Sequence, residues 1–209
     1  MSINLNISSI SEKRLIHLTD EELVSRCKTE LPHLTSAFEV LLYRYQPIVL
    51  ITCYKLIGNN QDAEEVCQDV FVRVFHHIKN FKERSSFKTW LYRIVHNASI
   101  SKAMGRSKYE KKAVGLSEVN ENQIIGKRTS NNDKSGTGFE DLQIYLALEL
   151  LSEEDRRIML LRFISGLSIK EISDVIGIEI NAVKVRLFRA KNRFRSAYGR
   201  TTCSQNGKF

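Results

Sequence analysis

Residues 166–194, GLSIKEISDVIGIEINAVKVRLFRAKNRF, constrain the fold of this chain more than any other stretch. Ile169, Ile172 and Val175–Ile176 form one side of a short helix, and Gly177 permits the tight turn that follows. A second helix keeps a buried stripe at i, i+4, i+7 and i+11, formed by Val183, Leu187, Ala190 and Phe194. Two short helices joined at a glycine predict a helix-turn-helix, whose second helix enters the major groove of DNA.

Positive charge is concentrated on that second helix. The 209 residues carry a net charge of +8, and residues 179–200 alone hold seven Lys and Arg against one Glu. Such a concentration favours a polyanionic partner, most simply nucleic acid, over a plain basic amphipathic helix. The candidate DNA contacts on the outward side and flanks of this helix are Asn181, Lys184, Val185, Arg186, Phe188, Arg189, Lys191 and Arg193.

The rest of the chain also has helical periodicity, with only two prolines. Thr19 to Glu22 form a capping box that opens a helix to about Thr29. A helix over about 35–56 contains Pro47, where we expect a kink or a break, and further helices are predicted at 62–78 and 86–102. LQIYLALELL and SEEDRRIMLLRFISG predict two more after residue 139. The predicted fold is all-α, with helical domains at 19–102 and 139–198, a flexible linker at 103–138, and tails at 1–18 and 199–209.

Motifs for covalent, metal or cofactor chemistry are not found. Cys27, Cys53, Cys67 and Cys203 lack CxxC spacing, which predicts free thiols in a reducing compartment. The sequence has no HExxH, P-loop, GxGxxG or GxSxG, so we expect no catalytic residue, no metal and no cofactor. Without a signal peptide or a membrane-length apolar run, the chain is expected to be cytoplasmic, with no membrane insertion.

The two central helices each present a polar face. Asp62, Glu65 and Asp69 share one arc, and their spacing alone favours a solvated face over a docking surface for a basic partner. In the next helix the predicted core stripe is Phe87, Trp90, Leu91, Ile94 and Val95. The opposite arc has no carboxylate and consists of Lys88, Thr89, Tyr92, Arg93, His96 and Asn97.

Taken in order, these motifs resemble a known family. DAEEVCQDVFVRVF followed by NFKERSSFKTWLYRIVHN resembles the sigma-2 domain of the extracytoplasmic-function (ECF) branch of the sigma-70 family of bacterial RNA polymerase sigma factors. LSEEDRRIMLLRFISGLSIKEISDVIGIEINAVKVRLFRAKNRF resembles the sigma-4 domain, so the resemblance covers 20–102 and 139–198. It implies a non-enzymatic factor that directs promoter recognition, DNA melting and transcription initiation.

The resemblance also implies partners and residues. The partners are core RNA polymerase, through its beta-prime clamp helices and beta flap, and promoter DNA. Polymerase docking would fall to Asp62, Glu65, Gln68 and Asp69. The −10 element would be bound by Asn80, Phe81, Lys82, Arg84, Lys88, Tyr92, Arg93, His96 and Asn97, with Trp90 structural. The −35 element would be bound by the candidate residues on 181–193.

The chain departs from the family pattern at two DNA-reading places. After Asn97 it reads ASISKAMGRSKYEKK, without the usual Asp and Arg-rich helix end, and Glu179 and Ala182 replace a Ser cap and a nearby Thr. We therefore expect polymerase binding with weak promoter selectivity, or dependence on another targeting factor. The residues leave open whether an anti-sigma factor exists. The alternatives are a helix-turn-helix regulator that does not dock on polymerase, which leaves the acidic helix unexplained, and a DNA-modifying enzyme, which lacks a catalytic cluster.

Overall fold

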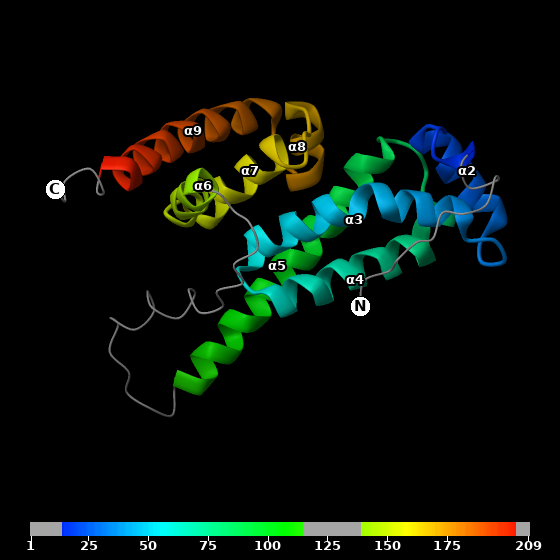
Figure 1. The fold of residues 1–209 in the computed structure, drawn as a ribbon, viewed down its shortest axis with the longest axis horizontal. Coiled ribbons are helices and arrows are strands. Elements are labelled where there is room, and N and C mark those ends of the chain that lie inside the picture. Colours follow the sequence, from blue (N-terminus) through cyan, green and yellow to red (C-terminus); the bar gives the residue numbers. More distant parts are fainter. Residues whose placement is uncertain (1–13, 115–138, 204–209) are drawn as a thin grey trace. The chain divides into compact units, whose positions relative to one another are not determined.

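The computed structural model describes residues 14–114 and 139–203, which contain helices and turns but no strand (Figure 1). By its internal contacts the chain divides into two compact units, Met1–Lys102 and Ala103–Phe209. The predicted all-α fold with two helical units is confirmed. Residues 1–13, 115–138 and 204–209, which hold most of the predicted tails and linker, lie outside the described residues.

The first unit contains α2 (Asp20–Glu30), α3 (Ser36–Ile57), α4 (Asn60–His77), the short 3-10 helix η1 (Ile78–Asn80) and the start of α5 (Phe87–Val114). The capping box of α2 is confirmed, because the Thr19 hydroxyl accepts a bond from the Glu22 N–H and the Glu22 carboxylate accepts one from the Thr19 N–H. α3 packs against both α2 and α4. The fully buried core of this unit includes Leu23, Val24, Leu41, Val49, Val70 and Leu91.

The end of the predicted N-terminal tail is part of this unit. Leu15 is buried, and Arg44 of α3 donates to the carbonyls of Ile16 (2.7 Å) and Leu18 (2.6 Å) and pairs with Asp20 (2.7 Å). A tail that runs to residue 18 is therefore wrong for residues 15–18. Their contacts come from a helix more than twenty residues away, which local sequence patterns do not report.

Three helices differ from the sequence prediction. α3 is one continuous helix through Pro47, so of the expected kink or break the break is wrong: buried side chains on both sides of the exposed proline hold the helix against its partners. α4 begins at Asn60 because the Asn59 side chain accepts from the Asp62 N–H at 3.0 Å. α5 continues to Val114 rather than ending near Lys102, so the first part of the predicted linker is helical. Gly105 costs only about 1 kcal/mol in a helix of good formers.

The second unit contains α6 (Phe139–Glu149), α7 (Glu153–Phe163), α8 (Ile169–Ile176) and α9 (Ile180–Cys203). The predicted helix-turn-helix is α8 and α9, and Gly177 between them has a φ of 77° with its N–H bonded to the Ser173 carbonyl. Ser168 and Glu171 form a capping box that the sequence reading missed. On α9 the predicted stripe is confirmed for three buried residues, and Phe194 is half-buried and stacks on Tyr198.

Arg156 of α7 fixes the corner between α6 and α7. Its guanidinium is buried and donates to the carbonyls of Leu148 (3.0 Å) and Glu149 (2.9 Å), while it also pairs with the Glu149 carboxylate (3.2 Å). These carbonyls belong to the last turn of α6, where no helical donor is available. One cation therefore caps α6, which packs on α9.

Candidate functional surfaces

The acidic face of α4 lies on the surface. We define the acidic ridge as Asp62, Glu65, Gln68 and Asp69, of which the last three are exposed and Asp62 is half-buried. The opposite face of α4 is buried, as its periodicity predicts, through Ala63, Val66, Cys67, Val70, Phe71 and Val74. The fold therefore leaves this face available to a basic partner.

Lys102 of α5 already pairs with one end of the acidic ridge. Its ammonium lies 2.7 Å from a carboxylate oxygen of Glu65 and 3.3 Å from one of Asp62. The hydrogen bond to Glu65, joined by the charge of Asp62, raises the pKa of Lys102. Asp69 makes no ion pair with the rest of the described chain. Sequence reasoning missed this contact because about forty residues separate the partners.

The buried face of α5 differs from the predicted one. Phe87, Leu91 and Val95 are buried as expected, but Trp90 and Ile94 are only half-buried. Three residues of the predicted DNA-binding arc are instead in the core: Tyr92 (0% exposed), Thr89 (0%) and His96 (6%). The prediction that Tyr92 and His96 line a DNA surface is wrong, because the tyrosine ring is a large apolar body that the core accepts. Lys88 is half-buried, and Arg93 and Asn97 are exposed.

The loop before α5 is anchored by Phe81, which was predicted to contact DNA. Phe81 is buried, stacks on Trp90 with ring centroids 4.8 Å apart, and has the Lys28 ammonium 5.6 Å from its ring centre. Lys28 also pairs with Glu83, a non-glycine residue with a φ of 54°. Phe81 is therefore a hydrophobic anchor and not an exposed DNA contact. Asn80, Lys82 and Arg84 are exposed on the same loop.

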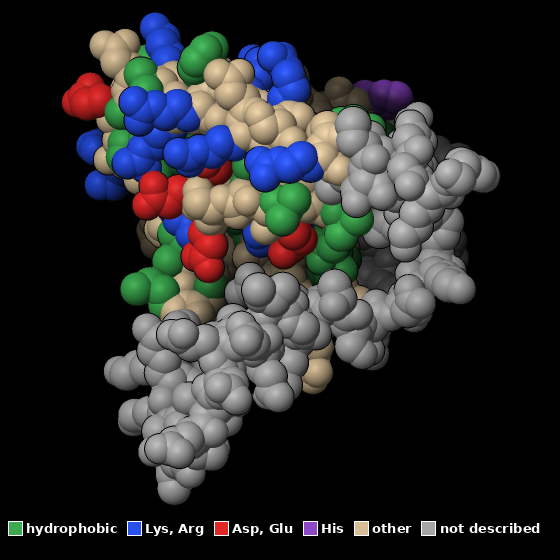
Figure 2. Space-filling view, turned by 90° about the vertical axis from the view of Figure 1, so that its left-hand side faces the viewer, with side chains coloured by type: hydrophobic (Ala, Val, Ile, Leu, Met, Phe, Trp, Pro, Cys, Tyr) green, Lys and Arg blue, Asp and Glu red, His purple; other side chains and the backbone are tan. Residues whose placement is uncertain are grey.

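The predicted DNA contacts of α9 fall into two sets. The outward stripe, opposite the buried stripe, is exposed along its length and consists of Asn181, Lys184, Val185, Phe188 and Arg189. In Figure 2, Lys and Arg side chains gather in the upper part of the view, where α9 lies. The other three contact α7: Arg186 pairs with Glu154 (3.2 Å), Arg193 with the buried Asp155, and Lys191 lies over the Phe163 ring.

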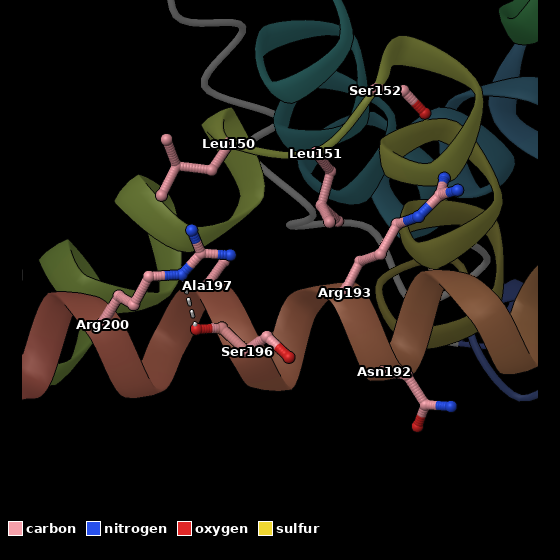
Figure 3. Close-up of a pocket in the computed structure, with 8 residues that line it drawn as sticks. All are labelled: Leu150, Leu151, Ser152, Asn192, Arg193, Ser196, Ala197 and Arg200. Carbon is pink, nitrogen blue, oxygen red and sulfur yellow. Dashed lines mark hydrogen bonds between the residues drawn. The ribbon is translucent and has the colours of Figure 1, made fainter.

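A cavity of about 480 Å³ lies between the α6–α7 turn and α9. Leu150, Leu151 and Ser152 line one side, and α9 supplies Asn192, Arg193, Ser196, Ala197 and Arg200. Figure 3 shows the guanidinium groups of Arg193 and Arg200 on the side of α9 that faces this turn, and Arg200 donates to the Ser196 carbonyl (3.3 Å). The lining of the cavity combines apolar, polar and cationic side chains. Sequence reasoning did not find it, because its two sides come from separate helices.

The described residues contain no cluster of three or more His, Cys, Asp or Glu side chains placed to hold a metal ion. Cys27, Cys53 and Cys67 are buried free thiols, as predicted, while the side chain of Cys203 lies outside the described set. Burial is the main cause that raises the pKa of Cys27 and of Cys67 to about 12 and that of Cys53 to about 11. None of the described helices combines the length and the apolar character that crossing a membrane requires.

Comparison with known proteins decides the family. The sequence model of Sigma-70 region 2 matches residues 41–108, which include the acidic ridge and the start of α5, and that of Sigma-70 region 4 matches residues 141–194. An ECF RNA polymerase sigma-E factor of Haemophilus influenzae is 28% identical over 179 residues, 83% of this chain and 92% of the relative. The chain belongs to the ECF branch of the sigma-70 family.

Further relatives agree with this assignment. The ECF sigma factor SigW of Bacillus subtilis is 26% identical over 163 residues, 76% of this chain and 87% of SigW. Two solved structures share the fold at 22% identity: RpoE of Bartonella quintana in complex with the anti-sigma factor NepR (TM-score 0.63, covering 77% of this chain and 95% of RpoE), and CnrH in complex with the cytosolic domain of CnrY (0.61, 85% and 95%).

Proposed function

We propose that this sigma factor docks on core RNA polymerase through the acidic ridge and holds promoter DNA on two separate cationic surfaces. The observation that carries the proposal is the separation of charge between α4 and α9. The ridge presents carboxylates on a face with no role in the core, whereas residues 180–209 contain no Asp or Glu. A helix-turn-helix regulator that never docks on polymerase gives no reason for a region 2 match over residues 41–108.

Polymerase docking rests on charge complementarity. The exposed carboxylates of Glu65 and Asp69 suit a basic surface such as the beta-prime clamp helices. The second unit would meet the beta flap, for which the cavity beside α9 offers apolar contact. An anti-sigma factor, like that bound to the structurally similar RpoE, belongs among the partners to be sought.

The proposed −10 surface is smaller than the sequence predicted. It consists of the exposed or half-exposed residues of the loop and of α5, namely Asn80, Lys82, Arg84, Lys88, Arg93 and Asn97. Cations and the two amides suit phosphates and splayed bases. Phe81 and Tyr92 act indirectly, by holding the loop and α5 in place. Trp90, stacked on Phe81, keeps its structural role in this proposal.

The proposed −35 surface is the outward stripe of α9, and it starts without the usual hydroxyl cap. Glu179 precedes α9, and its carbonyl accepts from the Val183 N–H. Replacing a Ser or Thr cap costs typically about 1 kcal/mol. We therefore keep the proposal that promoter selection is weak or depends on another factor. In vitro transcription from a random promoter library tests it, and a sharp two-part consensus obtained without an added factor would refute it.

Co-purification of the tagged full-length chain with core RNA polymerase at low salt tests the docking. We expect the double variant Glu65→Lys and Asp69→Lys to lose most of the bound polymerase, because two attractive contacts become repulsive. Glu21→Lys is the matched control, since Glu21 is an exposed acid on α2 away from the ridge. Equal retention of polymerase by all three proteins would contradict docking through the ridge.

A further inference from the structure

The outward stripe of α9 contains two large apolar side chains that the fold does not use. Val185 is 47% exposed and Phe188 is 66% exposed. The packing of α9 comes from the opposite side of the helix, where Val183, Leu187 and Ala190 are buried. Exposed apolar groups gathered on one face often mark a binding surface. We therefore expect these two side chains to contact a partner.

The charges around this apolar pair restrict the partner. Lys184 and Arg189 are exposed on the same stripe, and no carboxylate lies anywhere on residues 180–209. The partner is thus anionic, and under the proposed function it is duplex DNA. Phosphate groups make no favourable contact with an apolar side chain. In the major groove, however, the C5 methyl group of thymine is an apolar group on a base edge.

We propose that Val185 and Phe188 read thymine methyl groups in the DNA held by α9. The inference rests on the proposed function and adds the chemical basis of its base selection. The two residues are three positions apart, which places them about 4.5 Å apart along the helix axis. Base pairs of a duplex are about 3.4 Å apart, so the pair fits thymines on neighbouring or nearly neighbouring steps.

Under this proposal the charged side chains of α9 have other roles. Lys184 and Arg189 are left for phosphates or guanine edges. Arg186 and Arg193 are engaged by the acids of α7 and add little to base selection. A methyl contact discriminates modestly, by about fourfold for each methyl group removed from water. Reading through methyl groups therefore agrees with weak promoter selectivity.

Uracil substitution tests the inference, because it removes only the methyl group and keeps the hydrogen-bonding groups of the base. Duplexes that bind the full-length chain are first selected from a random pool at low salt. The selected duplex is then prepared with thymine or with uracil throughout, and both dissociation constants are measured by fluorescence anisotropy. We expect thymines on close steps, and binding about fifteenfold weaker with uracil if two methyl groups are read.

The double variant Val185→Ala and Phe188→Ala should bind both duplexes equally. Its side chains are exposed, so the fold should persist, which circular dichroism checks. Lys184→Ala is the matched control, and it should weaken binding to both duplexes by the same factor. A double variant that still prefers thymine, or a wild-type chain that never does, overturns the inference while DNA binding stands. If the wild-type chain retains no duplex at low salt, the DNA-binding half of the proposed function is refuted, and the inference is refuted with it.

Discussion

Truncation of Arg156 to alanine should unfold the second unit at mild denaturant while the first unit stays folded. The guanidinium makes two short bonds to carbonyls of the last turn of α6 and an ion pair with Glu149, and its side chain is 8% exposed. Hydrogen bonds to charged groups contribute about 1.5–3 kcal/mol each. Removal of one partner of a buried pair costs about 3–5 kcal/mol. We expect a loss of about 3–5 kcal/mol, a large share of the roughly 5–15 kcal/mol by which a small domain is stable.

The single tryptophan makes the two units separable in this assay. Trp90 belongs to the first unit, so its fluorescence reports that unit alone, whereas far-ultraviolet circular dichroism reports both. With a urea slope of about 1.5 kcal/mol per molar, the midpoint of the second unit should fall by about 2 M or more. Glu149→Gln is the comparison variant: it removes the carboxylate charge but keeps both carbonyl bonds of Arg156, so it should cost clearly less than Arg156→Ala. Equal shifts in fluorescence and circular dichroism, or a change under 1 kcal/mol for Arg156→Ala, would refute the reasoning.

Three further outcomes follow from the first unit. Tyr92→Ala should destabilise it by about 3–5 kcal/mol, as for other large buried aromatics, and an unchanged urea midpoint would show that Tyr92 is not a core residue. Lys102→Met should modestly strengthen polymerase binding at low salt, because Glu65 is released for the partner's cations. The exposed Lys82 supplies the control variant Lys82→Met, and weaker binding by Lys102→Met would contradict a competing role. Burial raises the pKa of Cys27 and Cys67 from 9.0 to about 12, so the folded state keeps thiols that ionise once unfolded. The contribution of these thiols to the free energy of unfolding should be constant below pH 9 and fall from there toward pH 12, and midpoints that do not change between pH 9 and pH 12 would contradict it.

Local signals gave the accurate predictions. The capping box at Thr19 and the turn at Gly177 depend on residues within one helical turn, so the sequence displays them directly. The acidic face of α4 was found for the same reason, because charged residues at helical spacing stay outside the core. The end of α5 was missed because a polar, lysine-rich stretch resembles a linker in composition, yet it holds mostly good helix formers.

The buried face of α5 shows a different limit of sequence reasoning. On a helical wheel Tyr92 and His96 count as polar residues, so the core arc was predicted on the opposite side of the helix. In the structure both residues are buried. In the folded unit the ring of Tyr92 contributes more apolar surface than a smaller aliphatic side chain could. Phe81 was assigned to DNA through the resemblance of its loop to the family's, but its ring is buried and stacks on Trp90. Amphipathic aromatic residues can be assigned only once their neighbours are known.

The cations of α9 show that the same limit applies to functional residues. Arg189 and Arg193 are the same residue type on one helix, four positions apart, and a charge count treats them as equal. In the fold Arg189 is exposed, whereas Arg193 pairs with the buried Asp155 of α7 and thereby joins two helices. Removing Arg193 would leave a buried carboxylate without its partner. A loss of DNA binding in such a variant would therefore reflect lost stability before it reflected a lost DNA contact. Under the proposal above, the outward stripe is the part of α9 that contacts DNA directly. Its two cations, Lys184 and Arg189, leave part of the base selection to Val185 and Phe188.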